Sequence, residues 1–273
     1  MPSGMLGDDA DRRRELAIAL GGGFVVSLAA GMFGVGGGVL LVPLLVLVLR
    51  RSQHVAHATS LVAILFASVS GGTRFAFDDA VAWPAAAILA VAAVAGAQAG
   101  ARVLPKLTDS FLRRLFGGVL LAVAIRFVAF GSGAAETGHS APDLTTGVIA
   151  GLVLVGLFIG VASAVLGVGG GVLLVPILVL AFGFGQHIAE GTSLVVVVPT
   201  AISGAIAHHR NGYTDWSLGG VLGITGVVGG ALGATFALGL DPDLLGRLFG
   251  ALLGLVSLLM IWPPRRPPLE AGR

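Results

Sequence analysis

The chain contains one ten-residue sequence twice, and this repetition constrains the fold more than any other feature. GVGGGVLLVP occupies positions 34–43 and again positions 167–176, and residues on both sides of it recur at the same spacing. Thr59 matches Thr192, for example, and Trp83 matches Trp216. Both copies are almost entirely apolar. A duplicated apolar unit that is interrupted by glycine and proline at matching places is typical of secondary transporters.

The composition predicts that the protein lies in a lipid bilayer. The chain is 56% hydrophobic and 11% charged, whereas soluble domains carry roughly 25% charged residues. Its apolar segments are about as long as the roughly 20 helical residues that cross a hydrocarbon core. They are continuously apolar rather than alternating, which disfavours a β-barrel. We therefore expect an all-α, polytopic integral membrane protein, located in a bacterial inner (plasma) membrane.

Several other functions are disfavoured. The formal charge is only +2, and the basic residues sit at segment ends, where they set membrane orientation rather than bind nucleic acid. The absence of cysteine from the sequence excludes disulfides and thiolate chemistry. No HExxH, nucleotide-binding loop, paired catalytic carboxylates or Ser/His/Asp order is present. We predict no enzyme, no catalytic residue, no metal site and no cofactor.

The apolar segments divide the chain into two repeats. A polar tail (1–15) precedes the first repeat (16–130), and a linker (131–143) leads to the second repeat (144–261) and a C-terminal tail (262–273). A cleaved signal peptide is the alternative for the N-terminus, but the apolar run that follows carries the glycine motif, so we expect it to be retained. Eight hydrophobic segments result: 16–49, 59–77, 83–104, 111–130, 144–182, 192–207, 216–240 and 244–261.

The first segment of each repeat is too long for one ordinary span. Three consecutive glycines interrupt it, each costing roughly 1 kcal/mol relative to alanine in a helix. We predict a helix that ends at Phe33 or Leu166, a glycine turn, and then a short helix over 39–49 or 172–182. Eleven helical residues span about 16 Å, roughly half a bilayer. The short helices are therefore expected to enter the membrane and turn back.

The distribution of basic residues tests this arrangement. If the broken segments return to the side they entered from, each half crosses an odd number of times and the halves are inverted. With the N-terminus inside, 13 of the 16 Lys and Arg residues then lie inside, and Arg74, Arg126 and Arg247 lie outside. If each long segment crosses once, seven fall outside: Arg50, Arg51, Arg102, Lys106, Arg113, Arg114 and Arg247. The positive-inside rule favours the inverted halves.

The glycine motif is the strongest indication of a binding site. Glycines expose backbone N–H groups at the start of the following short helix, where the helix dipole also attracts anions. Within a membrane, irregular backbone is tolerated only where it is buried in protein or lines a water-filled cavity. The predicted substrate-binding glycines are Gly36, Gly37, Gly38, Gly169, Gly170 and Gly171. The alternative is close helix packing, the role we expect for Gly21, Gly22, Gly23, Gly229 and Gly230.

Repeated polar residues follow each glycine motif. Thr59, Ser60, Thr192 and Ser193 open the second span of each half; one hydroxyl of each pair is expected to cap the helix and the other to bind substrate. Gln53 and Gln186 lie in the preceding connections, each followed by a histidine, and either contact substrate or hold the short helix. Glu190 has His57 as its counterpart and is a candidate for coupling transport to protons, because carboxylates within membranes are usually functional.

A GxGGGxLxxP segment followed by TSL in both halves resembles the sulfite exporter TauE/SafE family, also called the toluene sulfonate uptake permease family. The resemblance covers residues 16–261. It implies a secondary transporter of small anions such as sulfite, thiosulfate or organosulfonates. We predict that a small anion binds near the midplane at the two GVGGG half-helix ends. An anion channel with the same site is the alternative, followed by a membrane enzyme or assembly factor. The sequence leaves substrate, direction, coupling ion and oligomeric state open, a homo-oligomer included.

Overall fold

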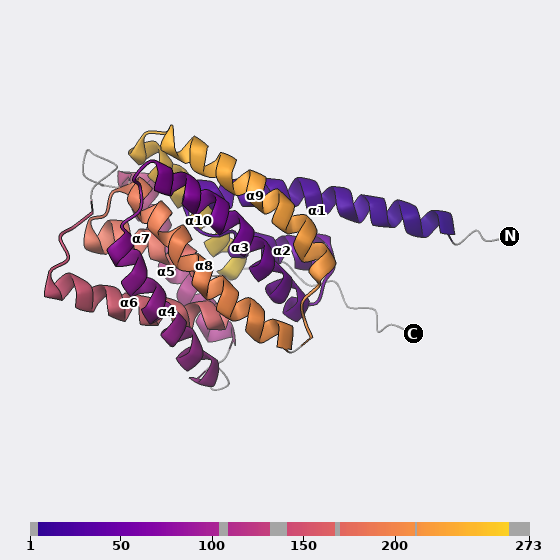
Figure 1. Cartoon of the computed structure of the whole chain (residues 1–273), viewed down its shortest axis with the longest axis horizontal. Coiled ribbons are helices and arrows are strands. Elements are labelled where there is room, and N and C mark those ends of the chain that lie inside the picture. Colours follow the sequence, from indigo (N-terminus) through magenta and orange to yellow (C-terminus); the bar gives the residue numbers. More distant parts are fainter. Residues whose placement is uncertain (1–4, 104–108, 132–140, 167–169, 211, 262–273) are drawn as a thin grey trace.

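A computed structural model describes residues 5–103, 109–131, 141–166, 170–210 and 212–261. These residues form a bundle of helices, from which the start of the first helix projects (Figure 1). In chain order the elements are α1 (Met5–Phe33), α2 (Gly38–Pro43), η1 (Leu44–Val48), α3 (Gln53–Phe77), α4 (Trp83–Val103), α5 (Asp109–Phe130), α6 (Thr146–Leu166), α7 (Gly171–Phe182), α8 (Gln186–Arg210), α9 (Trp216–Leu238) and α10 (Pro242–Ile261).

The broken segments are confirmed. The helices α1 and α6 end at Phe33 and Leu166, as the glycine motifs predict. A short helix follows each of them: α2 continued by the π-helical turn η1 in the first half, and α7 in the second. Gly36 and Gly37 have φ angles of 71° and 88°, a left-handed conformation that glycine adopts at no steric cost. The glycines therefore reverse the chain between the long and the short helix.

The second helix of each half begins earlier than predicted. The sequence suggested starts at Thr59 and Thr192, whereas α3 and α8 begin at Gln53 and Gln186. The cap of α3 is Ser52, whose hydroxyl accepts a hydrogen bond from the Val55 N–H at 3.4 Å. The capping prediction was wrong because hydrophobicity marks where a helix becomes apolar, not where it begins. The two Gln-His pairs consequently lie in the first helical turns rather than in the connections.

Six of the described helices are long and apolar enough to cross a membrane: α1, α3, α6, α8, α9 and α10. We also expected spans at α4 and α5, which have 21 and 22 residues. Their apolar stretches are shorter, Trp83–Ala99 and Leu120–Ala129. Basic residues occupy one end of each helix, Arg102 in α4 and Arg113 and Arg114 in α5. The count of eight segments remains a prediction.

The two halves interlock rather than sit side by side. The helix α1 packs along α9, and the equivalent pair α6 and α4 packs in the same way (Figure 1). Both interfaces depend on glycine: a Cβ added at Gly96 would stand 2.2 Å from the Leu157 carbonyl oxygen, and one at Gly229 would stand 2.9 Å from that of Phe24. Such close backbone approach is how small residues join membrane helices.

The packing role expected for other glycines is largely correct. A Cβ at Gly230 would lie 2.4 Å from the Ala67 carbonyl oxygen, and one at Gly23 would lie 2.7 Å from a Leu222 methyl carbon. Gly22 faces the Leu44 side chain at 3.0 Å. At Gly21 nothing among the described residues lies within 4 Å, so the packing prediction fails at this residue.

The repeated threonines join the connections of opposite halves. The Thr192 hydroxyl accepts a hydrogen bond from the Ala82 N–H at 3.0 Å, and the Thr59 hydroxyl accepts one from the Asp215 N–H at 3.2 Å. Ala82 follows α3 and Asp215 follows α8, so each helix begins beside the end of the other. The equivalent helices α3 and α8, which pack against each other, therefore run antiparallel.

One pair of equivalent interfaces differs between the halves. The helix α3 packs closely on α9, whereas the equivalent contact between α8 and α4 is much less extensive. At the close interface, a Cβ on Gly219 would stand 3.3 Å from Val62, and one on Gly223 would stand 2.8 Å from the Phe66 ring. The positions of these glycines are taken by Ala86 and Ala90 in α4. The wider separation of α4 and α8 leaves a cavity between them.

Candidate anion-binding site

The two glycine motifs meet in the interior. A Cβ added at Gly171, the first residue of α7, would stand 2.9 Å from the Val35 carbonyl oxygen and 3.0 Å from that of Gly34. The start of the second short helix therefore lies directly against the turn of the first half. Gly37 and Gly170 precede the two short helices, and neither helix has a side-chain cap. Their first N–H groups are therefore not occupied by a capping side chain.

The helix α8 packs against the first glycine turn. The Ser193 hydroxyl donates a hydrogen bond to the Gly34 carbonyl oxygen at 2.7 Å. A Cβ at Gly34 would stand only 2.6 Å from the Cα atom of Glu190. Ser193 and Glu190 are both fully buried. The absence of a side chain at Gly34 thus allows two polar residues of the second half to reach the backbone of the first.

Glu190 belongs to a buried polar pair. The Gln186 amide nitrogen donates a hydrogen bond to one Glu190 carboxyl oxygen at 2.7 Å. The other carboxyl oxygen and the Gln186 amide oxygen have no hydrogen-bond partner among the described residues. No basic side chain in this part of the chain pairs with Glu190. Burial of a carboxylate is costly without a counterion, which keeps Glu190 a candidate for the coupling role expected from the sequence.

Of the four predicted hydroxyls, Ser193 alone is seen to reach a glycine motif within the described residues. Thr59 and Thr192 instead hold the backbone of the opposite half, as described above. The Ser60 hydroxyl donates to the His57 carbonyl oxygen at 2.9 Å within its own helix. The hydroxyls of Thr59, Ser60 and Thr192 thus have partners outside the glycine motifs.

Three of the remaining predicted residues are glycines next to the start of a short helix. Gly37 and Gly170 face the long helices that precede them: an added Cβ would lie 3.0 Å from the Ala30 Cβ and 2.7 Å from an Ile159 methyl carbon, respectively. Gly38 is buried at the start of α2.

The other predicted residues are Gly169, Gln53 and the histidines that follow the two glutamines. Gly169 and the Gln53 side chain are outside the described residues. His54 is exposed and lies beside the Tyr213 ring, with a centroid separation of 5.1 Å. His187 is buried, and its Nε2 lies 3.0 Å from the Ala237 carbonyl oxygen. The repeated histidines therefore have different surroundings in the two halves.

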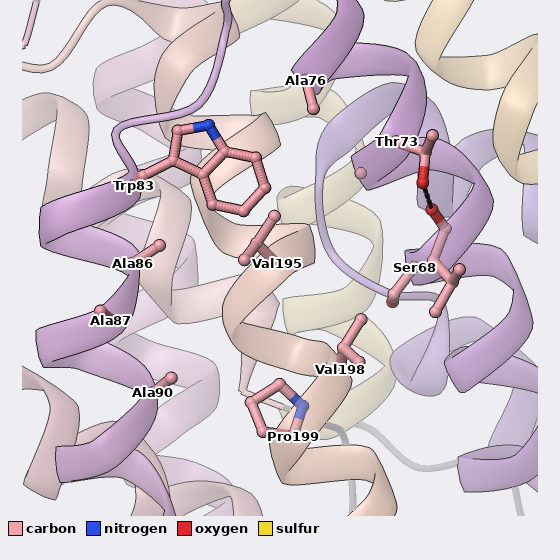
Figure 2. A pocket seen from close by; sticks show the side chains of 12 residues that line it. Ser68, Thr73, Ala76, Trp83, Ala86, Ala87, Ala90, Val195, Val198 and Pro199 are labelled. Atoms are coloured by element: carbon pink, nitrogen blue, oxygen red, sulfur yellow. Dashed lines mark hydrogen bonds between the residues drawn. The ribbon is translucent and has the colours of Figure 1, made fainter.

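Sequence reasoning missed Ser68, which lies on the other side of the first turn. A Cβ at Gly36 would stand 3.3 Å from the Ser68 hydroxyl oxygen. Ser68 is fully buried, and its hydroxyl has no hydrogen-bond partner among the described residues. It also lines a cavity of about 560 Å³ between α3, α4 and α8 (Figure 2). The second copy has Ala201 at this position, so the repeat did not draw attention to Ser68. A hydroxyl within an apolar span was the one available signal, and Ser70 and Thr73 of the same helix give it as well.

Interlocked homologous helical halves, joined at paired glycine-broken helices, form the architecture of a polytopic membrane transporter. The chain matches the family described as "Sulfite exporter TauE/SafE" over residues 5–127 and 152–273, and therefore belongs to that family.

Similar proteins carry compatible names. A probable membrane transporter protein of Xylella fastidiosa is 29% identical over 91% of this chain and 96% of its own length. One from Haemophilus influenzae is 27% identical over 87% and 95%. One from Methanocaldococcus jannaschii is 24% identical over 88% and 92%. No solved structure matches the chain. The chain is thus an integral membrane protein of a transporter family, which points away from catalysis, and its bacterial relatives support the plasma membrane as its location.

Proposed function

We propose that this protein is a secondary transporter of a small anion, either sulfite or another sulfur oxyanion or organosulfonate. The anion binds where the two glycine motifs meet, near the membrane midplane. The observation that carries the proposal is the contact of Gly171 with the backbone of Val35 and Gly34. It brings an uncapped helix start, whose N–H groups and dipole favour negative charge, to the turn that Ser193 also reaches.

We propose that the halves have inverted topology and work as a carrier rather than as a channel. The antiparallel arrangement of α3 and α8 supports inversion. Inverted halves would also place 13 of the 16 Lys and Arg residues on the inner side, as the positive-inside rule favours. The unequal packing of α3 on α9 and of α8 on α4 supports a carrier. A carrier alternates between two such arrangements, each opening the site to one side of the membrane.

Glu190 is the proposed coupling residue. A carboxylate beside the first glycine turn would repel an anion unless it carried a proton. The nearest groups in the described chain offer no compensating positive charge: Gln186 donates an amide hydrogen bond, and Gly34 contributes backbone. Anion and proton would then occupy the site together and move in the same direction.

Transport by the purified full-length chain in liposomes tests the proposal. Labelled sulfite, thiosulfate and methanesulfonate should be taken up and should compete, whereas sugars and cations should have no effect. Unlabelled anion on the opposite side should accelerate flux, because trans-stimulation is a property of carriers and not of channels. Uptake that a neutral solute inhibits more strongly than every oxyanion would contradict the anion site.

A matched pair of serine variants locates the site. Ser193→Ala removes the hydroxyl that reaches Gly34, whereas Ser60→Ala removes its repeat equivalent, which bonds within its own helix. The hydrogen bond to Gly34 contributes about 0.5–1.5 kcal/mol. If it holds the turn in the conformation that binds the anion, Ser193→Ala should weaken anion affinity about two- to tenfold. Ser60→Ala should leave it unchanged. Equal effects of the two substitutions would argue against a site at the first glycine turn.

A further inference from the structure

We infer that the cavity between α3, α4 and α8 binds the apolar part of an oxyanion, while Ser68 at its inner end donates a hydrogen bond to the charged group. Among the proposed substrates, an anion that carries a short chain or a ring would accordingly bind more tightly than a bare inorganic ion. This inference rests on the proposed anion site at the glycine turns and extends it to a second, apolar subsite.

The Ser68 hydroxyl provides the polar end of the subsite. It is fully buried, has no partner among the described residues, and lies beside Gly36 in the first turn. Thr73, the other hydroxyl at the cavity, already donates to the Val69 carbonyl oxygen at 2.6 Å. A buried hydroxyl that lacks a partner is unfavourable. A ligand oxygen would supply the missing acceptor for Ser68, whereas Thr73 needs none.

The walls of the cavity are apolar. Trp83 and Ala90 of α4 face Val195 and Pro199 of α8, with Ser68 and Thr73 on α3 beyond them (Figure 2). The volume of about 560 Å³ lies within the range of small-molecule sites, about 300–1,000 Å³. Sulfite, with one sulfur and three oxygens, would leave most of this space empty. An apolar substituent would fill it and contact the walls.

The cavity leads from the end of the helices to their middle. Trp83 begins α4, and tryptophan prefers the membrane–water interface. Ser68 lies near the middle of the 25-residue helix α3. An anion that enters past Trp83 would therefore reach Ser68 and the glycine turn at about mid-depth, with its apolar part behind it.

The subsite is formed at one of the two equivalent places in the duplicated fold. At the equivalent place, Val62 and Phe66 pack against Gly219 and Gly223 of α9. Ala201 takes the position of Ser68 there. The unpartnered hydroxyl and the open cavity thus occur together and are missing together, as expected if both serve one ligand.

A homologous series of alkanesulfonates tests the inference on the full-length protein in lipid nanodiscs. Methane-, ethane-, propane- and butanesulfonate are compared as competitors of labelled sulfite. Burial of each methylene should tighten binding by up to about fourfold, the equivalent of about 0.8 kcal/mol. An affinity that stays flat or falls along the series would overturn the apolar subsite.

Matched variants locate the effect. Trp83→Ala should flatten the dependence on chain length, whereas Trp216→Ala, its repeat equivalent with a similar exposed fraction of 56% against 58%, should preserve it. Ala90→Leu, which fills the cavity, should weaken butanesulfonate and leave sulfite unaffected. Equal chain-length dependence in Trp83→Ala and Trp216→Ala, together with unchanged butanesulfonate binding in Ala90→Leu, would refute the assignment of the cavity.

The hydroxyl is tested separately. Ser68→Ala should weaken all members of the series by the same factor, about two- to tenfold, and Thr73→Val should have no effect. No loss in Ser68→Ala would overturn the role of Ser68. If neither sulfite nor any sulfonate binds to the wild-type protein, the anion site itself is wrong, and this inference fails with it. If sulfite binds but the affinity does not change from methanesulfonate to butanesulfonate, the apolar subsite is refuted and the anion site stands.

Discussion

Gly171 is the position at which one added methyl group tests the contact between the two glycine motifs. In the substitution Gly171→Ala, the new Cβ would stand 2.9 Å from the carbonyl carbon and oxygen of Val35 and 3.0 Å from the Gly34 oxygen. Ordinary contacts of a Cβ atom lie at 3.4–4 Å. The motifs would have to separate by about 0.5 Å, against backbone atoms that cannot rotate away as a side chain could.

The expected magnitude follows from two opposing effects. Overpacking of a buried site costs about 1–3 kcal/mol, whereas alanine is more favourable than glycine in a helix by about 1 kcal/mol. Gly220→Ala is the control, because Gly220 lies in the helix α9 with no described atom within 4 Å of an added Cβ. The control retains the propensity gain without the steric cost. The difference in unfolding free energy between the two variants should therefore be about 1–3 kcal/mol.

Reversible unfolding in mixed micelles measures this difference, and calorimetric titration with sulfite measures its effect on the site. Gly171→Ala should lose both stability and anion affinity relative to Gly220→Ala. If the two variants are equally stable and bind sulfite equally, the motifs do not touch, and the argument for a shared site fails.

Three further predictions concern the turns, the topology and the coupling. Gly37→Leu and Gly170→Leu should abolish transport with normal membrane insertion, because both residues have positive φ angles and tight neighbours; retained transport would return them to a packing role. Cysteines placed at Arg51 and Phe182 in this cysteine-free chain should be labelled from opposite sides of the membrane, and labelling from one side would contradict inverted halves. The wild-type protein should accumulate methanesulfonate up to tenfold per pH unit on the alkaline side, since one proton is worth about 1.4 kcal/mol per unit. Glu190→Gln should only equilibrate it, and gradient-driven accumulation by this variant would exclude Glu190 as the coupling group.

Local backbone chemistry could be predicted from the sequence, and cross-half contacts could not. The glycine motifs determine where α1 and α6 end, because the cost of glycine in a helix and its freedom at positive φ act within a few residues. One hydroxyl of each Thr-Ser pair was expected to cap its own helix, yet Thr59 and Thr192 accept hydrogen bonds from the N–H groups of Asp215 and Ala82. A hydroxyl has the same chemistry in either role, so its partner depends on tertiary packing that sequence spacing does not encode.

The differences between the two copies are more informative about the site than their identities. Repeated residues such as Thr59 and Gly96 build the interlocked scaffold, because each makes an equivalent contact twice. An anion that has no two-fold axis, such as sulfite or a sulfonate, cannot be contacted identically by two halves related by a two-fold axis. Its specific partners are therefore expected where the copies differ. The polar residues Glu190 and Ser68 have His57 and Ala201 as their counterparts. They come from different helices, yet both border the first glycine turn, at Gly34 and Gly36 respectively. Exchanging Ser68 for the alanine of the other copy should therefore impair transport, whereas exchanging Thr59 for serine, which keeps a hydroxyl for the Asp215 N–H, should not.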